Sequence, residues 1–467
     1  MTGRLKTRKR SATSDPKDRA GMVLYAILMI GAISTMIAAS VMFRTRAEVA
    51  ASHGYVRGDQ AWEVAYSGLK HAMAVLAQPP SEGGNYDNPD LYESQFVCEE
   101  GGDQWYFTIY AYNDDDPETV RYGVTDTAAQ INLNTASRKV LEALPNMTPE
   151  LVDCLIDFRD ADDEPGQNGA EQDYYNQLAH PYAIRNSALM SVEELLLVKG
   201  FDGTLVYGED ANFNGLLDIN EDDGEETHPD DDSDGILNRG LRAIMTTISY
   251  GVNIDNANQA RININGKIDN RTLRRAVGRS TAEFIEFCRE GNKKFTHPSE
   301  LLRMSFTGKE DGRSKTEQSP VTSASKLAVV LDKLCVVDAK IFPNSAINVN
   351  SASREALAAV LGEDNVDLVD RIVTIRADLA PEDKATTAWL LENGLVSATK
   401  FKEIAPLLTA RGFQHRVQVV GFGVKSGRYC VLEAIVDPIG GSVLYLRDLT
   451  ALGMPFGLEN VQELAGD

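Results

Sequence analysis

The sequence predicts an α+β fold in which a long N-terminal helix packs on an antiparallel sheet and a large helical domain is inserted between the strands. Three observations lead to this prediction. A long apolar stretch continues into an amphipathic helical pattern, strand-like segments lie near both ends of the chain, and an Ile-Asn-x-Asn motif recurs in the middle.

An uncharged run of 22 residues, Met22 to Phe43, follows a basic leader. At about 1.5 Å per residue, a helix of this length reaches roughly 33 Å, enough to cross a hydrocarbon core of about 30 Å. Residues 1–21 carry seven Lys and Arg against two acids, so the positive-inside rule keeps the leader cytoplasmic. We therefore expect residues 22–43 to span a membrane and the remaining chain to lie outside the cytoplasm.

Three interpretations of this start remain open. A cleaved secretory signal peptide would end at a small-residue site such as Ala38-Ala39-Ser40, but its apolar core is usually only about 7 to 15 residues long. A plain membrane anchor is the second interpretation. The third is favoured because the leader ends in Gly21 directly before the span. This start resembles the type IV prepilin class, in which a membrane peptidase cuts after that glycine and methylates the new N-terminus, here Met22.

The composition indicates an exported globular body. The chain has a net charge of -23, and removing the leader's two acids and seven bases leaves 67 acids against 39 bases, a net charge of -28. Such a surface repels phosphates, so nucleic acid is not expected as a main partner. The five cysteines lie far apart without a CxxC pair, which gives no support to a zinc or thioredoxin-like site and leaves any disulfide pairing open.

A first pilin-like segment, residues 44–125, is predicted to hold the rest of the long helix and the first strands. Apolar residues recur at spacings of three and four from Trp62 to Leu76, and Pro79-Pro80 ends the pattern. We expect one helix from about Met22 to about Ala77, the alternative being two helices broken near Gly54 or Gly58. Residues 105–112 and 119–124 then predict a hairpin, because aromatic and β-branched residues flank a polar turn.

The C-terminal segment, residues 412–467, predicts three more strands of the same sheet. Its strand-like segments are 415–424, 428–436 and 443–449, separated by turn sequences rich in glycine. If these strands pair with the early hairpin, everything between the two becomes an insertion into the sheet.

The insertion carries a repeated element. Ile131-Asn132-Leu133-Asn134-Thr135-Ala136-Ser137 is nearly copied by residues 347–353, and residues 262–265 repeat its first four positions. Asn134 or Thr135 in the first copy, and Asn350 or Ser351 in the last, are expected to cap the helices that follow. The sequence thus predicts helix-hairpin-helix, SAM-like domains over 126–261 and 339–411, with a variable helical insert at 262–338.

The best-known role of a helix-hairpin-helix is to hold DNA phosphates, but these copies are poorly suited to it. Phosphate binding needs a glycine-rich turn beside basic residues. The first copy has no glycine between Leu144 and Met147, and the last places Glu363 and Asp364 in its turn. A structural or protein-docking role is therefore favoured.

An acidic loop follows the first copy and has the spacing of an EF-hand ion loop. Positions 1, 3, 5, 9 and 12 carry side-chain oxygens, position 6 is Gly215, and the position that offers a carbonyl is Leu216. The predicted ligands are Asp210, Asn212, Asn214, Leu216, Asp218 and Glu221. Calcium is the expected ion, because it accepts 6 to 8 oxygens whereas magnesium needs a tighter octahedron.

A second acidic string, Asp230, Asp232 and Asp234, repeats only the first half of the ion loop, because Leu241 stands at its twelfth position. It is a weaker candidate for the same ion. A third acidic patch between Asp160 and Asp173 lacks loop spacing, and no ligands are predicted there. For both strings, a solvated acidic loop is the alternative.

Four sequence strings lie within the predicted domain 126–261: Phe158-Arg159-Asp160-Ala161-Asp162-Asp163-Glu164-Pro165, Asn168-Gly169-Ala170-Glu171, Tyr174-Tyr175 and Ser191-Val192-Glu193-Glu194-Leu195-Leu196. Together they resemble the K-type minor pseudopilin of type II secretion, the general secretion pathway protein K family. With the prepilin-like start and the Asn-rich motif, this resemblance covers most of the chain. It implies a pilin-like fold with a helical insertion, processing by prepilin peptidase, and a place at the pseudopilus tip in complex with I-type and J-type minor pseudopilins. The stretch 262–338 matches poorly.

No enzyme is predicted, since GxSxG, HExxH and P-loop motifs are missing from the sequence and its six histidines lack metal spacing. The leading hypothesis is an inner-membrane protein with a periplasmic body that caps the tip of a secretion pseudopilus. One alternative is a membrane-anchored periplasmic DNA-binding or uptake protein that uses the helix-hairpin-helix units. Another is a secreted calcium-binding enzyme whose mature chain begins after about Ala39.

The fifth residue after Gly21 is Ala26. The resemblance implies that pilins carry a glutamate there, whose carboxylate pairs with the N-terminal amine of a neighbouring subunit inside the apolar filament. A buried charge without its partner is costly. Ala26 is therefore expected in a subunit at the very tip, which has no preceding subunit to pair with.

Overall fold

The computed structural model describes residues 16–78, 84–113, 119–224, 226–310, 313–343 and 345–456, with the side chains of 16–22, 50–57 and 310 left aside. Most of the predicted leader, residues 1–15, lies outside this description, as do the side chains of Gly21 and Met22 at the predicted processing site. The chain divides into two compact units, Met1–Ala61 and Trp62–Asp467.

The first long element is a single helix, α1 (Pro16–Leu76), so the expected alternative of two helices broken near Gly54 or Gly58 is wrong. Its segment Val23–Val49 has a mean hydropathy of 2.2, and none of this segment's most apolar window is buried. This apolar helix is a candidate membrane anchor. The predicted span ended at Phe43, whereas the apolar segment of the helix continues to Val49. The helix ends at Leu76, three residues before Pro79, where a missing N–H and the proline ring oppose a further turn.

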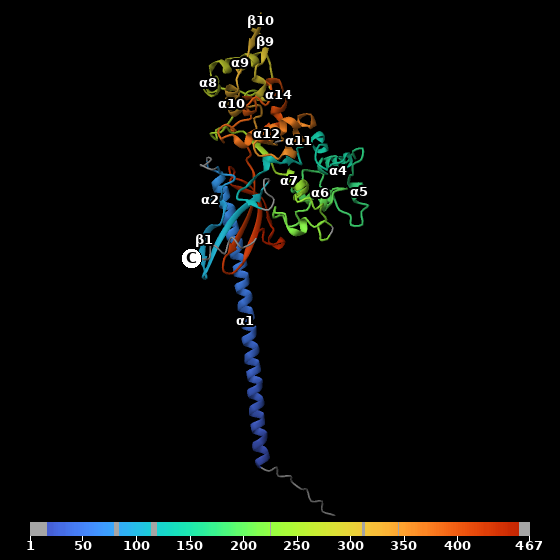
Figure 1. The fold of residues 1–467 in the computed structure, drawn as a ribbon, viewed down its shortest axis with the longest axis vertical. Coiled ribbons are helices and arrows are strands. Elements are labelled where there is room, and N and C mark those ends of the chain that lie inside the picture. Colours follow the sequence, from blue (N-terminus) through green and yellow to red (C-terminus); the bar gives the residue numbers. More distant parts are fainter. Residues whose placement is uncertain are drawn as a thin grey trace, which may run out of the picture. The chain divides into compact units, whose positions relative to one another are not determined.

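The sheet of the second unit combines strands from both ends of the chain. Figure 1 shows strands from the early part of the chain, in blue and cyan, beside strands from its end, in red. The strand order of this sheet is β1-β2-β15-β16-β17, with every neighbouring pair antiparallel. Its strands are β1 (Gln95–Glu100), β2 (Asp103–Tyr112), β15 (His415–Gly423), β16 (Tyr429–Asp437) and β17 (Ser442–Asp448). Ile109 pairs with Val419, which pairs in turn with Leu432, so the predicted meeting of the early hairpin and the late strands is confirmed.

Smaller elements complete this part. The predicted hairpin is present as β2 with β3 (Val120–Arg121), and β4 (Thr125–Asp126) pairs with β15. Helix α2 (Pro89–Tyr92) precedes β1, the 3-10 helix η1 (Thr127–Ala129) follows β4, and η7 (Thr450–Leu452) follows the last strand. Strand β1 was not expected from the sequence.

The part of α1 in the second unit is packed on the sheet. Ala65, Leu69 and Ala72 are completely buried, as their helical spacing predicts. A Cβ atom at Gly68 would lie 2.8 Å from side-chain atoms of Phe107 and Val419, so glycine is required where the helix crosses the sheet. Helix-to-sheet packing is thus very close at this point.

The inserted residues form three copies of one unit. Each copy starts with a two-residue strand, continues through a pair of helices and further short helices, and closes with a second two-residue strand parallel to the first. The first copy has β5 (Ile131–Asn132), α3 (Arg138–Glu142), α4 (Pro149–Arg159), α5 (Gln172–Tyr175), η2 (Val192–Leu197), α6 (Gly203–Tyr207), η3 (Ile219–Glu221), α7 (Gly240–Ile244) and β6 (Met245–Thr246).

The second and third copies are shorter. The second has β8 (Ile262–Asn263), α8 (Asn270–Val277), α9 (Arg279–Glu290), η4 (Pro298–Leu301), β9 (Ser305–Glu310), β10 (Arg313–Gln318), α10 (Ala324–Lys333) and β11 (Leu334–Cys335). The third has β13 (Ile347–Asn348), α11 (Arg354–Leu361), η5 (Glu363–Asn365), α12 (Val366–Asp378), α13 (Trp389–Glu392), α14 (Ala398–Ile404), η6 (Ala405–Leu407) and β14 (Leu408–Thr409). Strands β7 (Tyr250–Val252) and β12 (Ile341–Pro343) pair between copies.

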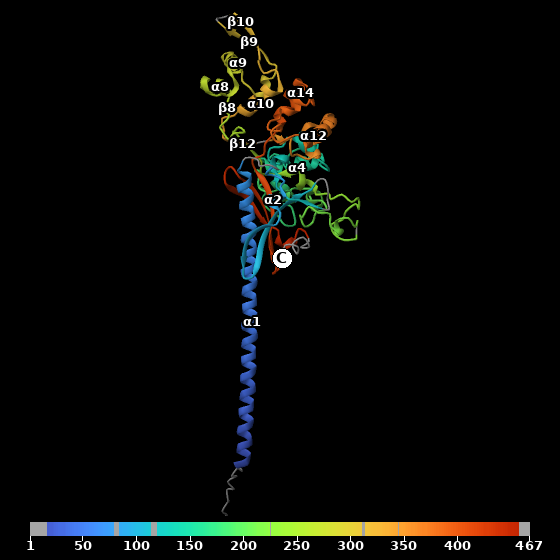
Figure 2. The same cartoon turned by 60° about the vertical axis from the view of Figure 1, so that its left-hand side comes forward.

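The segment expected to be a variable insert, residues 262–338, therefore has the architecture of its two neighbours. Figure 2 shows β9 and β10 as a two-stranded ribbon projecting from the helices of this middle copy. The three copies share one hydrophobic core, which includes Leu133, Ile264 and Val349 at equivalent positions of the motif.

The Asn-rich motif closes each copy through the same backbone contact. The N–H groups of Leu133, Ile264 and Val349 donate to the carbonyls of Thr246, Cys335 and Thr409 at 2.8, 2.9 and 2.9 Å. The asparagine before each of them, Asn132, Asn263 or Asn348, accepts from the backbone two residues later and turns the chain.

The second asparagine of the motif joins distant loops instead of capping a helix. Asn134 donates to the carbonyls of Leu189 and Thr247, and Asn350 donates to those of Lys384 and Ala410. The predicted caps Asn134, Thr135, Asn350 and Ser351 are wrong, because Ser137 and Ser353 stand at the N-caps of α3 and α11. Only Ser353 uses its hydroxyl as a cap, accepting from Ala356 at 3.2 Å.

Candidate metal centres

The acidic loop after α6 brings most of its predicted ligands into one buried turn. Asp210, Asn214 and Glu221 are buried, and Asn212, Leu216 and Asp218 are half-buried. Gly215 has φ of +71°, the left-handed conformation that an EF-hand-like loop needs at its sixth position. The loop thus curls in the way that its spacing predicts.

Glu221 ties the two ends of this loop together. Its two carboxylate oxygens accept from the N–H groups of Ala211 at 3.0 Å and Asp218 at 3.2 Å. Burial raises the pKa of Glu221 to about 7, because these two hydrogen bonds only partly compensate and the charges of Asp210 and Asp218 add to the effect. A cation at this point would offset the cost of the ionised carboxylate.

Asp210 carries the strongest local indication of a cation. Its Oδ1 atom is buried and has no hydrogen-bond partner in the described part of the chain. Burial raises the pKa of Asp210 to about 6, although the charges of Arg242 and Arg239 act in the opposite direction. A buried carboxylate oxygen without a donor is costly, and coordination of a cation would remove that cost.

The remaining predicted ligands form a hydrogen-bonded group around Asp218. Its Oδ2 atom accepts from the side-chain amides of Asn212 at 2.8 Å and Asn214 at 2.9 Å. The donor set is entirely oxygen, which suits calcium, and two asparagine amides lower the charge that the ion would have to balance. The residues present therefore fit the ion that the spacing predicts.

The second acidic string is arranged differently. Asp230, Asp232 and Asp234 are all exposed, and the residue that organises the turn is Asp231. The Asp231 carboxylate accepts from the N–H groups of Asp223, Gly224 and Ser233 at 2.8 to 3.0 Å. This part of the loop is ordered by backbone hydrogen bonds, and the three predicted ligands face solvent.

A third group lies in the acidic patch between Asp160 and Asp173, where no ligands were predicted from the sequence. Asp160, Asp162 and Glu171 each place one carboxylate oxygen within 4.8 Å of the others. Both oxygens of Glu171 are buried and lack a hydrogen-bond partner in the described residues. Burial, followed by the charges of Asp157 and Asp160, raises the pKa of Glu171 to about 7. This arrangement is suited to a divalent cation as well.

Two buried aspartates on α4 hold the loop that carries Glu171. Asp153 accepts from the N–H and side-chain amide of Asn168, and Asp157 accepts from the N–H of Gly166. A Cβ atom at Gly169 would overlap the Asp157 carboxylate, so glycine is needed for the loop to return to the helix. The Asn168-Gly169-Ala170-Glu171 sequence is therefore explained by the return of this loop to α4. A regular spacing of ligands along the chain does not reveal this return.

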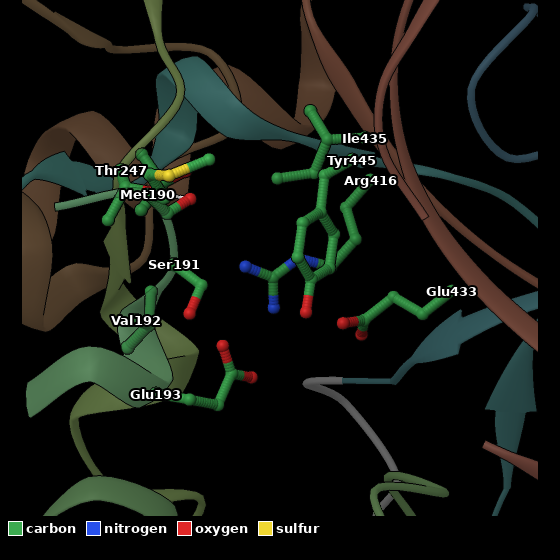
Figure 3. Close-up of a pocket in the computed structure, with 10 residues that line it drawn as sticks. Met190, Ser191, Val192, Glu193, Thr247, Arg416, Glu433, Ile435 and Tyr445 are labelled. Atoms are coloured by element: carbon green, nitrogen blue, oxygen red, sulfur yellow. Dashed lines mark hydrogen bonds between the residues drawn. The ribbon is translucent and has the colours of Figure 1, made fainter. Parts of the chain in front are cut away.

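The first copy is joined to the sheet by a partly buried ion network beside a pocket. Arg242 Nη2 lies 2.5 Å from Glu433 Oε2, and Glu193 Oε1 lies 2.8 Å from Arg447 Nη1. Figure 3 shows Met190, Ser191 and Glu193 facing Arg416 and Tyr445 across this pocket. These ion pairs join η2 and α7 of the first copy to strands β16 and β17.

Residues 123–207 match the family model described as "Type II secretion system (T2SS), protein K", and this segment contains β5, α3, α4 and the Asp160 group. The resemblance predicted from the sequence is confirmed over this segment.

Two curated relatives have the same description. The type II secretion system protein K of Pseudomonas aeruginosa is 29% identical over 196 residues, which are 38% of this chain and 57% of the relative. That of Aeromonas hydrophila is 25% identical over 213 residues, 40% of this chain and 60% of the relative. The matched segments thus span less than two thirds of either relative.

Among solved structures, the chain is similar to a chain in the crystal structure of the GspK-GspI-GspJ complex from enterotoxigenic Escherichia coli. The alignment covers 87% of this chain and 99% of that chain, with 12% sequence identity and a TM-score of 0.41.

Proposed function

We propose, from the match of residues 123–207 to the type II secretion protein K family, that this chain is a minor pseudopilin that caps the tip of the secretion pseudopilus. It takes part in protein export across the outer membrane as a structural subunit, without a catalytic activity of its own. The match of residues 123–207 is the observation that carries this proposal. The apolar helix Val23–Val49 and the mixed helix and antiparallel sheet content support it.

The membrane-born precursor would sit in the inner membrane with its body in the periplasm. Prepilin peptidase would cut between Gly21 and Met22 and methylate Met22. The mature subunit would then leave the bilayer and join the I-type and J-type minor pseudopilins in a tip complex. Ala26 supports the tip position, since it removes the charge by which internal subunits pair.

The pilin-like part carries a SAM-like, helix-hairpin-helix insertion that is proposed to act as a protein scaffold. Calcium is the proposed structural ion of its acidic loop, held by Asp210, Asn212, Asn214, the Leu216 carbonyl, Asp218 and Glu221. The buried, unpartnered oxygen of Asp210 supports this assignment. The Asp160 group is a further candidate, whereas the exposure of Asp230, Asp232 and Asp234 gives the second string little support.

The direct test is co-expression of the full chain with the I-type and J-type minor pseudopilins of the same bacterium. Purification through a tag on this chain is expected to recover all three in fixed proportion, and deletion of the gene is expected to stop secretion. Full secretion in the deletion strain, with no recovery of the other two proteins, would refute the proposal.

N-terminal sequencing of the protein from cells separates the interpretations of its start. A first residue of Met22, N-methylated, is expected. A start after about Ala39 would indicate a cleaved secretory signal, and an uncut leader would indicate a plain anchor. Salt-dependent binding of duplex DNA by the full chain would instead favour the alternative of a periplasmic DNA-binding protein.

A further inference from the structure

The middle copy of the insertion differs in charge from the rest of the chain. Residues 262–338 contain 14 Lys and Arg against 10 Asp and Glu, a net charge of +4, whereas the whole chain has a net charge of -23. This reversal is local to one of three units with the same architecture. The unit therefore carries a property that its fold does not require.

The positive charge is densest on one hairpin. Arg271, Arg274 and Arg275 lie on α8, and Arg279 is the first residue of α9. All four side chains are exposed. We call this set the arginine face. The corresponding turn of the third copy carries Glu363 and Asp364, so the hairpin forms equally well with the opposite charge.

Two arginines of this face already bind carboxylates within the chain. Arg279 Nε lies 2.7 Å from Glu283 Oε1, and Arg274 Nη2 lies 3.7 Å from Glu286 Oε2. Arg271 and Arg275 have no ion pair within the described residues. The face thus has two guanidinium groups outside any ion pair of the described residues, beside two that already lie close to carboxylates.

We propose that the arginine face is a docking surface for a partner protein that presents clustered carboxylates. Charge complementarity of this kind accelerates encounter and selects the partner. An extended polyanion fits less well, because the rest of the chain has a net charge of -27 (-23 less the +4 of residues 262–338) and repels phosphates. At physiological ionic strength charges act over only about 8 Å, so a compact acidic cluster can meet the face alone.

The test measures binding of a fluorescent peptide of alternating Asp and Glu to the detergent-solubilised full chain at low salt. The double variant Arg271→Glu, Arg275→Glu is expected to weaken binding at least about tenfold, and binding by the unmodified chain is expected to fall as salt rises. The matched control is Lys309→Glu, Arg313→Glu on the ribbon of the same copy, which makes the same charge change away from the face.

Three results would overturn the proposal. One is equal weakening by the ribbon control, which would show a non-specific effect of net charge. Another is undiminished binding by the face variant with an unchanged melting temperature. The third is binding of a duplex DNA of similar length, lost in the face variant, without binding of the acidic peptide, which would identify a nucleic-acid site. A single variant, Arg275→Gln, provides a milder measurement should the double variant fail to fold.

Discussion

Asn134 and Asn350 occupy the same position in the first and third copies of the inserted unit, and each side-chain amide donates to two backbone carbonyls from distant loops. Their oxygens accept from different groups. Asn134 Oδ1 accepts from the Leu189 N–H at 2.8 Å, and Asn350 Oδ1 accepts from the Trp389 indole at 3.0 Å. In the middle copy, Asn265 likewise donates to the carbonyl of Phe295 and accepts from its N–H.

Replacing Asn134 with alanine is expected to destabilise the chain by about 3 kcal/mol. The change leaves two carbonyls and one N–H without a partner in a partly buried site, and each such group costs about 1 to 3 kcal/mol when desolvated. Chemical denaturation followed by circular dichroism measures the loss. Asn270→Ala, at an exposed position of α8, is the control and should change stability by less than about 0.5 kcal/mol. Similar losses in both variants would contradict the bridging role of Asn134.

Calcium is expected to raise the melting temperature of the full chain by at least about 3 °C at pH 7.5, because it binds the folded loop only. Glu221→Gln should abolish most of this shift, since Glu221 supplies a buried carboxylate to the loop. Asp230→Asn, in the exposed second string, is the matched control and should leave the shift intact. A full calcium response in Glu221→Gln would place the ion elsewhere.

The calcium response should also depend on pH. The pKa values of Asp210 and Glu221 are raised to about 6 and about 7, so protons compete with the ion below neutrality. In chelator, stability should fall as pH rises from about 4.5 towards 7, because the unfolded chain loses these protons first. The melting shift caused by calcium is therefore expected to grow between pH 5.5 and 7.5. A shift that is constant over this range would argue against these two ligands.

His297 should make the fold sensitive to acid. Burial, helped by the charge of Arg261, lowers the pKa of His297 to about 4 from its ordinary value near 6.5. Below about pH 6.5 the His297 imidazole is protonated in the unfolded chain but stays neutral in the folded chain. The free energy of unfolding therefore falls between about pH 6.5 and 4, by up to about 1.4 kcal/mol per pH unit. His297→Asn can keep the cap to Ser299 and removes the titration, so melting temperature should fall less from pH 7 to pH 5. An unchanged fall would assign the acid sensitivity to other groups.

Ala26→Glu tests the position within the filament. Cleavage after Gly21 should continue, with no gain in assembly, because a tip subunit has no preceding subunit whose amine could pair with the new carboxylate. Ala26→Gln provides a neutral side chain of similar size as the control. Cross-linking of subunits in cells measures incorporation, and the appearance of this chain at internal positions of the filament would contradict the tip assignment.

Sequence patterns predicted the elements whose side chains repeat with a clear period. Strands β2, β15, β16 and β17 and the C-terminal end of the long helix were located to within about two residues, because their apolar residues follow the periods of strand and helix. The long helix begins at Pro16, six residues before the predicted start at Met22. Strand β1 was missed because Gln95 to Glu100 ends in two acids and alternates poorly. Its pairing with β2 is a tertiary effect that its own sequence does not carry.

The first and third inserted units were predicted from their repeated motif, whereas the middle unit was expected to be a variable insert. The middle copy keeps only Ile262-Asn263-Ile264-Asn265 of the motif and lacks the residues that follow it in the other copies. No ligands were predicted in the acidic patch around Asp160, because Glu171 reaches Asp160 through a return of the chain that no fixed spacing describes. Asp153 and Asp157 hold this return. The Asp210 loop could be proposed from sequence because its predicted ligands follow a regular spacing along the chain.

Each inserted unit begins and ends on adjacent strands, and the whole insertion has the same property. Ile262 pairs with Leu334 at the borders of the middle copy, and Asp126 pairs with His415 where the insertion leaves and rejoins the sheet. A segment whose two ends are neighbours can be excised or duplicated without moving the chain on either side. The architecture therefore allows the number of inserted units to change during evolution while the sheet keeps its register. Insertions of different length are compatible with the same helix and sheet.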